Sequence, residues 1–482
     1  MSNIRQKTLN GVVWSGIQRF GTMSITFVSN IVLARLLLPE DFGCIAMLMI
    51  FISLANTFID GGFGSALIQK KNPTNEDYST IFYWNIFLSF ILYIVLYVSA
   101  PLIADFYRIP LLSSVLRVQG IVLFFNALSI VQQNQLKKQL QFKKLSIVYI
   151  FSAIISLVVA LVTAYNGWGI WSLVVQNISI SVIHAILFWV VNKWRPLFVF
   201  SWKSFKELFS FGGFMLVSSL FSTFSNEMQG LLVGRMFNPA ILGFYNQAYR
   251  LEGSAATATS SIIDQVTYPV LASLQDDKTQ LINALKRFIQ IPAYICSLVM
   301  MILIVVAEPL IILLYSDKWI DCVPYFQILC IAGLAVCLQG SANNVIAAIG
   351  KSKVLLTWTI VKRSMTIILC LIGILVAGMD GLLWSCVLGA WCVYFINAYL
   401  VDKHVGYSFW KQIGLIMPSS IIAISIGLVV YYIGTLLSFG MYTTALIQVA
   451  LCIILYFMIS YMFKLQAFEY VYNVVLNKLK KK

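Results

Sequence analysis

The sequence has little charge. Asp, Glu, Lys and Arg together make up 11% of its 482 residues, whereas 60% are hydrophobic and the mean hydropathy is +0.87. Soluble domains carry roughly 25% charged residues, so this composition excludes a water-soluble globular protein. No long hydrophilic stretch is present either, which excludes a separate soluble domain. The start of the chain lacks the pattern of a cleavable signal peptide, so we expect the first helix to remain as an anchor.

Groups that serve catalysis or metal binding are also scarce. There are only two histidines, His184 and His404, and the nine cysteines lack the spacing of a metal site and lie mostly in apolar runs. We expect the cysteines to be small buried side chains without a disulfide framework. No Ser/His/Asp or Cys/His arrangement is visible. The sequence therefore predicts no metal, no cofactor and no enzymatic activity.

Long apolar runs are abundant. A membrane-spanning helix needs about 20 apolar residues, and the hydropathy pattern predicts an all-α integral membrane protein of about fourteen such helices. The predicted spans are 11–34, 42–68, 79–100, 111–134, 145–165, 168–191, 209–236, 240–272, 286–307, 322–349, 354–378, 381–401, 411–434 and 441–463.

Basic residues are distributed unevenly over the loops between these spans. Alternate connections hold most of the 33 Lys and Arg residues, including Lys143, Lys203 and Lys480. The opposite side has only Arg108 and Lys318 in its loops, with Arg35, Arg117 and Arg235 at helix ends. Because Lys and Arg favour the cytoplasmic side, we expect both termini to be cytoplasmic. This topology also explains the net charge of +15 without a nucleic acid as partner.

The first part of the chain repeats in the second. At a shift of 200 residues, Ala34–Pro39 with Gly43 aligns with Gly234–Pro239 and Gly243. Two further matches follow in the same order, of Pro101–Tyr107 with Pro309–Tyr315 and of Trp171–Ser172 with Trp384–Ser385. The repeat predicts an N-terminal lobe of six helices at 1–200 and a C-terminal lobe of six at 201–405. Residues 406–482 then form two extra helices and a basic cytoplasmic tail. Repeats of equal orientation are related by an axis along the membrane normal, and the substrate site lies between them.

Polar residues recur at helical spacing on three of the predicted spans. These stripes are Ser15, Arg19, Thr22, Thr26 and Ser29; Met215, Ser219, Ser222, Asn226 and Gln229, in which Met215 is apolar; and Asn246, Arg250, Gly253, Thr257, Ser260 and Asp264. A poorer stripe lies on the span 42–68 and consists of Ala46, Ile50, Ser53, Thr57, Asp60 and Gly64. Small polar residues also let helices pack closely, so packing is the alternative explanation for each Ser and Thr.

Packing explains the charged residues less well, because a charge within a membrane is costly and usually functional. We therefore predict a cationic, hydroxyl-rich cavity that suits an anion, because arginine binds phosphate oxygens through a planar pair of N–H donors. Its predicted binding residues are Arg19, Arg250, Thr22, Thr26, Asn226, Gln229, Asn246 and Tyr249. Arg250 and Glu252 are two positions apart, about 200° around a helix, so they should not share a face.

Three acidic residues are candidates for coupling transport to H⁺ or Na⁺. We favour Glu227, which has no acidic counterpart at the repeat-related Phe27, and consider Glu252 and Asp60 as further candidates. The alternative is an Arg–Glu pair that only locks the helix bundle together.

Several segments resemble the polysaccharide-exporter branch of the multidrug/oligosaccharidyl-lipid/polysaccharide (MOP) flippase superfamily, and are most similar to Wzx-type and colanic or teichuronic acid exporters. They are Gly11–Trp14, Ala34–Gly43, Asp60–Gly64, Ala66–Gln69, Gln141–Lys144 and Trp194–Pro196. The resemblance covers essentially the whole chain and implies twelve core helices in two lobes, here with two more.

The activity that the resemblance implies is export of undecaprenyl-diphosphate-linked oligosaccharide units for surface polysaccharide synthesis. Membrane lipids surround such a protein, and a polysaccharide polymerase would act on its product. Two members of the same superfamily are alternatives: a flippase for the peptidoglycan precursor, and a multidrug antiporter that expels cations and would favour an acidic cavity. A membrane-embedded glycosyltransferase would need a large outer loop with paired acids, and the outer loops are too short for one.

Overall fold

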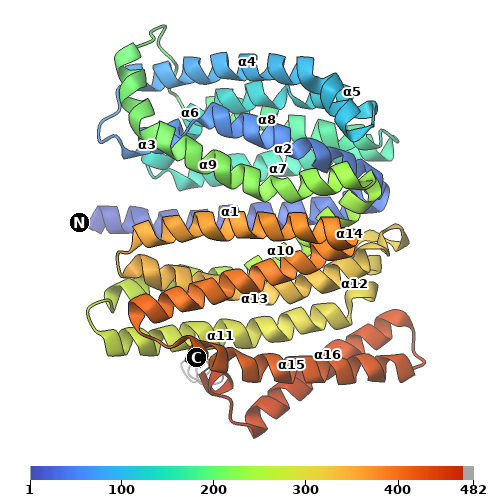
Figure 1. Ribbon diagram of the computed structural model, residues 1–482. Coiled ribbons are helices and arrows are strands. Elements are labelled where there is room, and N and C mark those ends of the chain that lie inside the picture. The colour runs from blue at the N-terminus through green and yellow to red at the C-terminus, as the bar shows by residue number, and fades with distance from the viewer. Residues whose placement is uncertain (1, 471–482) are drawn as a thin grey trace. The chain divides into compact units, whose positions relative to one another are not determined.

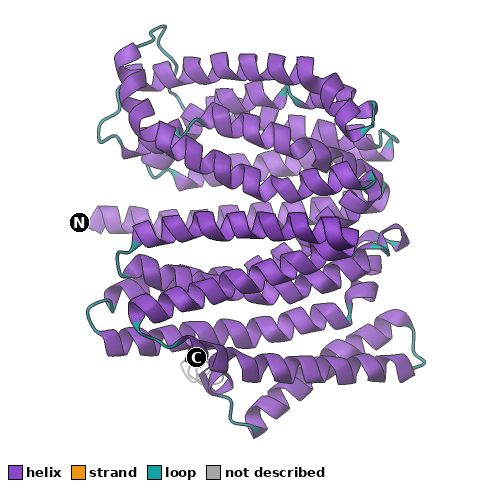
Figure 2. Cartoon of the chain, in the orientation of Figure 1, coloured by secondary structure: helices purple, strands orange, loops and turns teal. Residues whose placement is uncertain are grey.

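The computed structural model describes residues 2–470, without the side chains of 2–10, 12, 261–266, 352–353 and 356. The tail that contains Lys480 and the side chain of Asp264 therefore lie outside the described part. Within the described residues every regular element is a helix (Figure 2). The prediction of an all-α membrane protein is confirmed.

The chain divides into two compact units, Met1–Gly243 and Phe244–Lys482. The predicted lobes rest on the repeat and not on contacts, so their boundaries remain a prediction. The first unit contains nine helices and the start of a tenth (Figure 1): α1 (Ser2–Leu36), α2 (Pro39–Asp60), α3 (Phe63–Gln69), α4 (Asn75–Tyr107), α5 (Leu111–Gln119), α6 (Val122–Lys138), α7 (Phe142–Tyr165), α8 (Ile170–Val191), α9 (Trp202–Met236) and α10 (Pro239–Ser273).

The second unit contains the rest of α10 and the helices that follow it. These are α11 (Lys278–Val305), α12 (Ala307–Tyr315), the short 3₁₀ helix η1 (Asp317–Trp319), α13 (Cys322–Ala348), α14 (Ser352–Val405), α15 (Phe409–Leu436) and α16 (Met441–Met462). The helices α15 and α16 pack on α11. The Tyr456 hydroxyl of α16 donates a hydrogen bond to the Tyr294 carbonyl oxygen of α11 at 3.0 Å.

Each predicted span falls largely on helical residues, but local residues change where the helices begin and end, and the span 111–134 is divided between α5 and α6. Gly61 and Gly62 adopt positive φ angles of 57° and 70°, a conformation that favours glycine, and they split the span 42–68 into α2 and α3. The spans 354–378 and 381–401 both lie in α14, which is interrupted at Ala377 and Gly378. Glycine is needed there as well, because Gly378 has φ 60° and ψ −133°.

Eleven helices of the described residues are long and apolar enough to cross a membrane. In this number α2 and α3 count together, α5 and α6 count together, and α14 counts once. The eleven helices do not include α1 and α10, which carry two of the predicted polar stripes. The protein is thus a multi-pass membrane protein, while the number of fourteen spans remains a prediction.

The two copies of the repeated Pro–Gly motif contact each other at the starts of α2 and α10. A Cβ atom at Gly43 would overlap the carbonyl oxygen of Pro239, and a Cβ atom at Gly243 would overlap that of Pro39. A contact in which each copy presents the same atoms to the other is typical of a two-fold relation. The reciprocity supports the duplication that the sequence indicates.

Candidate functional site

The stripe on α1 divides into an exposed and a buried part. Arg19 and Thr26 are exposed, and Thr22 is half-buried, with its hydroxyl donating to the Gln18 carbonyl oxygen at 2.7 Å. Ser29, at the other end of the stripe, is buried and accepts a hydrogen bond from the Gln176 amide of α8 at 2.7 Å. Ser29 therefore serves helix packing, whereas Arg19 has its guanidinium on an accessible surface of the first unit.

The helix α9 packs on α2 within the first unit. Two polar pairs connect them: the Ser53 hydroxyl donates to Glu227 Oε1 at 3.3 Å, and the hydroxyls of Thr57 and Thr223 are 3.0 Å apart. Ser53 and Thr57 of the poorer stripe therefore connect α2 with α9, which agrees with helix packing as the alternative explanation for these residues. Glu227 is half-buried and forms no ion pair with any described residue, so an Arg–Glu lock at this position is not seen in this structure.

The predicted binding residues of α9 are accessible to different degrees. Asn226 is exposed and Gln229 is half-buried, and both residues take part in further interactions. Arg19, Thr22, Thr26, Asn226 and Gln229 all belong to the first unit, whereas the remaining predicted binding residues belong to the second. Whether the two groups form one site remains a prediction.

The helix α10 presents its predicted binding residues and Glu252 on different faces. Tyr249 and Arg250 are exposed, Asn246 is half-buried, and the Tyr249 ring stacks on that of Tyr245 with centroids 6.0 Å apart. Glu252, in contrast, is only 6% exposed. The expectation that Arg250 and Glu252 do not share a face is confirmed.

Glu252 is buried among residues of α11 and α13. A Cβ atom at Gly333 would overlap Glu252 Oε1, and Met300 lies on the same side of Gly333. Among the described residues, Oε1 has no hydrogen-bond partner. A buried ionised carboxylate without a partner is strongly unfavourable. A proton or a cation beside this oxygen would remove that cost, which keeps Glu252 a candidate coupling residue.

Asp60 lines a polar pocket inside the first unit, with a volume of about 470 Å³. The helices α2, α3, α6, α7 and α8 contribute to it, and Lys137 supplies the opposite charge. Amide groups surround the pair: Asn126 donates to Asn56 at 2.9 Å, and Gln133 donates to the Tyr149 hydroxyl. One carboxylate and one ammonium group leave the pocket close to neutral, so its amides and hydroxyls suit a neutral hydrogen-bonding group better than an ion.

Sequence reasoning misses the positions of Lys137, Lys362 and His184 in the structure. The charge pattern places Lys137 in a cytoplasmic loop, yet it lies at the end of α6 and faces this pocket. Lys362 of α14 is buried, and its ammonium group donates to Asn397 Oδ1 at 2.7 Å. A lysine inside the predicted span 354–378 is the signal that could have found it. His184 also lines the polar pocket that contains Asp60. Its ring lies edge-on to that of Tyr149, with the two centroids 4.8 Å apart, and its Nε2 has no hydrogen-bond partner among the described residues.

Comparison with known proteins identifies relatives along most of the chain. Residues 32–324 match the family profile described as polysaccharide biosynthesis protein. The teichuronic acid biosynthesis protein TuaB of Bacillus subtilis (strain 168) is 27% identical over 74% of this chain and 74% of its own length. The lipopolysaccharide biosynthesis protein WzxC of Escherichia coli (strain K12) is 23% identical over 89% of both chains.

Solved structures share the fold. The lipid II flippase MurJ in its inward closed conformation superposes with a TM-score of 0.73 at 14% identity, covering 94% of this chain and 98% of its own. A multidrug resistance MATE transporter of the MOP superfamily, in an inward-facing conformation, gives a TM-score of 0.60 at 16% identity, covering 82% and 98%. At these identities the similarity concerns the fold alone.

Proposed function

The chain belongs to the polysaccharide biosynthesis protein family of the MOP superfamily, and we propose that it is a flippase for undecaprenyl-diphosphate-linked oligosaccharide units. In this function it carries the units across the inner membrane by alternating access, and the sugars are then used for surface polysaccharide such as O-antigen, capsule or exopolysaccharide. A polysaccharide polymerase would be the next protein to act on them.

The family match over residues 32–324 is the observation that carries this proposal. Relatives that extend over most of the chain are named for teichuronic acid and lipopolysaccharide biosynthesis, and a third, ExoT of Rhizobium meliloti (strain 1021), is a succinoglycan biosynthesis transport protein that is 24% identical over 80% of this chain. The polymers differ between these relatives. What they share is assembly of a polysaccharide, which favours a carrier-linked oligosaccharide over a drug-like cation as the substrate.

The orientation in the membrane is part of the proposal. The bias of Lys and Arg toward alternate loops supports cytoplasmic termini. In this orientation the polar pocket of the first unit lies toward the cytoplasmic ends of its helices, because it includes Lys137 near the end of α6.

Arg19 and Arg250 are the proposed contacts of the diphosphate. An arginine binds phosphate oxygens through a planar pair of N–H donors, and both side chains lie on exposed surfaces of their own unit. Thr22, Thr26, Asn226, Gln229, Asn246 and Tyr249 are the proposed contacts of the sugars. For coupling to H⁺ or Na⁺ we propose one of the acids Glu227, Glu252 and Asp60.

A deletion strain tests the function directly. We expect loss of the surface polymer and accumulation of lipid-linked repeat units on the cytoplasmic side, with both defects reversed by the wild-type gene on a plasmid. Normal polymer without accumulation would refute the proposal. A block of peptidoglycan synthesis with accumulation of its lipid-linked precursor would instead identify the substrate as that precursor.

A further inference from the structure

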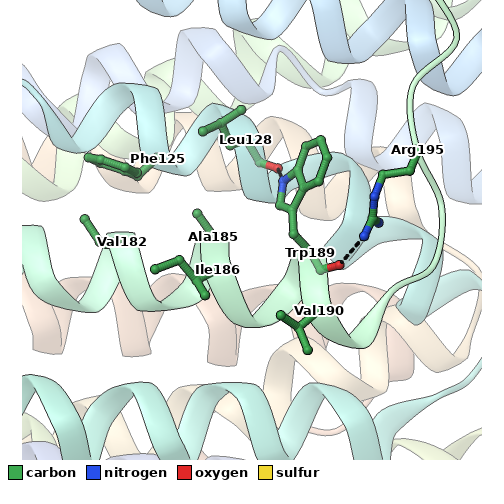
Figure 3. Close-up of a pocket in the computed structure, with 8 residues that line it drawn as sticks. All are labelled: Phe125, Leu128, Val182, Ala185, Ile186, Trp189, Val190 and Arg195. Atoms are coloured by element: carbon green, nitrogen blue, oxygen red, sulfur yellow. Dashed lines mark hydrogen bonds between the residues drawn. The ribbon is translucent and has the colours of Figure 1, made fainter.

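An apolar groove lies between α6 and α8 on the surface of the first unit. Figure 3 shows its eight lining residues, which are Phe125, Leu128, Val182, Ala185, Ile186, Trp189, Val190 and Arg195. The groove has a volume of about 530 Å³. Seven of its residues are apolar, and the charged one, Arg195, lies at one end (Figure 3).

The groove faces outward from the helix pair. Ile186 and Val190 are 56% and 71% exposed, and both lie in the span Ile170–Val191, which is apolar enough to cross a membrane. The residues Val182 to Val190 cover about 12 Å of helix at 1.5 Å per residue. Half of the hydrocarbon core is about 15 Å thick, so the groove would run along most of one leaflet.

Arg195 is held in place at the end of the groove. Its Nη1 donates to the carbonyl oxygens of Asn192 and Trp194, each at 2.8 Å. Its Nη2 donates to the carbonyl oxygen of Trp189 at 3.0 Å, the hydrogen bond drawn in Figure 3. Its guanidinium also lies over the Trp189 ring, 5.1 Å from the centroid. The Trp189 indole in turn donates to the Leu128 carbonyl oxygen of α6 at 3.0 Å.

These contacts fix the guanidinium and leave it partly available. Arginine has five N–H donors, the carbonyl oxygens use only part of them, and the side chain is exposed. It follows the end of α8 by four residues, which would place it at the level of the lipid headgroups. A fixed cation at that level, with an apolar channel leading from it into the hydrocarbon, is complementary to an anionic lipid.

We propose that this groove is a binding site for an anionic phospholipid, with one acyl chain along Val182, Ile186 and Val190 and the phosphodiester on Arg195. The single charge of the site matches the single charge of a phosphodiester such as that of phosphatidylglycerol. A lipid diphosphate carries more charge and would require further cations in the groove, and the lining includes none besides Arg195.

Native mass spectrometry of the purified full-length protein tests the site, with phosphatidylglycerol and phosphatidylcholine of the same acyl chains as probes. One cation near a membrane surface contributes about 1 kcal/mol, or about a fivefold preference for an anionic lipid. We expect Arg195→Gln to lower the preference by about that factor and Arg195→Lys to retain part of it. Arg117→Gln is the matched control, because Arg117 also stacks on an aromatic ring and donates to a backbone carbonyl oxygen, both of Tyr97.

A second variant tests the groove without touching the arginine. Val182→Phe places a ring in the channel and should weaken phosphatidylglycerol binding while Arg195 stays in place. Glycerol phosphate without acyl chains should not compete at millimolar concentration. Equal binding of the two lipids by the wild type, equal effects of the Arg195 and Arg117 variants, or competition by glycerol phosphate alone would each overturn the proposal.

Discussion

At the scale of single residues, the two arginines proposed to bind the diphosphate are the most direct test of substrate binding. A charge-assisted hydrogen bond contributes about 1.5–3 kcal/mol, so Arg19→Ala or Arg250→Ala should reduce export by about tenfold or more at unchanged protein level. Arg→Lys should retain part of the activity, because the charge remains and the planar pair of donors is lost. Export is measured as surface polymer in the complemented deletion strain.

The control for this experiment is Arg117→Ala, which removes an arginine outside the predicted stripes. Its export should equal that of the wild type. Normal export by both Arg19→Ala and Arg250→Ala would mean that the two arginines do not bind the substrate.

The acidic residues differ in their surroundings, and this difference makes coupling testable. Glu227 accepts a hydrogen bond from Ser53, Glu252 is buried with an unpartnered oxygen, and Asp60 shares a pocket with Lys137. We expect Glu227→Gln to abolish the response of transport to a pH gradient in proteoliposomes, with Glu252→Gln and Asp60→Asn as the other candidates. Glu207→Gln serves as the control, since Glu207 is 58% exposed and pairs with Lys70.

The result assigns the coupling residue by exclusion. If Glu227→Gln responds to the gradient as the wild type does, Glu227 is not the coupling acid. If all three variants respond as the wild type does, no proton passes through these residues.

At the scale of the helices, the reciprocal glycine contact predicts a steric effect. Gly43→Ala and Gly243→Ala each place a methyl group against a proline carbonyl oxygen at the starts of α10 and α2. Overpacking of this kind costs about 1–3 kcal/mol, so both variants should lower the thermal unfolding temperature of the detergent-purified protein. Because the contact is reciprocal, the two decreases should be similar.

Gly230→Ala is the matched control for the glycine pair. Gly230 lies in the helix α9, and a methyl group added there would have no neighbouring atom within 4 Å. Alanine is favoured over glycine within a helix by about 0.5–1 kcal/mol, so this variant should leave the unfolding temperature unchanged or raise it. A large decrease for Gly43→Ala with none for Gly243→Ala would contradict a two-fold contact.

At the scale of the whole molecule, the distribution of basic residues predicts which loops face the cytoplasm. Single cysteines at 143 and 203 should be protected from a membrane-impermeant thiol reagent in intact cells, whereas cysteines at 108 and 318 should react. The background has all nine native cysteines replaced; they are buried or half-buried. Permeabilised cells give the control, since all four positions should then react. Labelling at 203 in intact cells would contradict the two-repeat topology.

The sequence by itself determined the membrane class, the helices and the duplication, because each depends on features that are local or repeated along the chain. Apolar runs must form helices in a bilayer, where backbone groups need internal hydrogen bonds, and the predicted spans fall largely on helical residues, while the number of fourteen spans remains a prediction. The opposite faces of Arg250 and Glu252 also follow from helical periodicity alone.

Only the tertiary structure decided what each polar residue contacts. Ser29 and Thr57 have the spacing of cavity residues, yet they pair with Gln176 and Thr223 in helix packing. Lys137 has the sequence context of a loop residue, yet it shares a pocket with Asp60, which is far away in the sequence. The groove that ends at Arg195 likewise requires α6 beside α8. The physical reason is that helical spacing specifies a face of a helix, whereas the neighbour of that face depends on how distant segments pack.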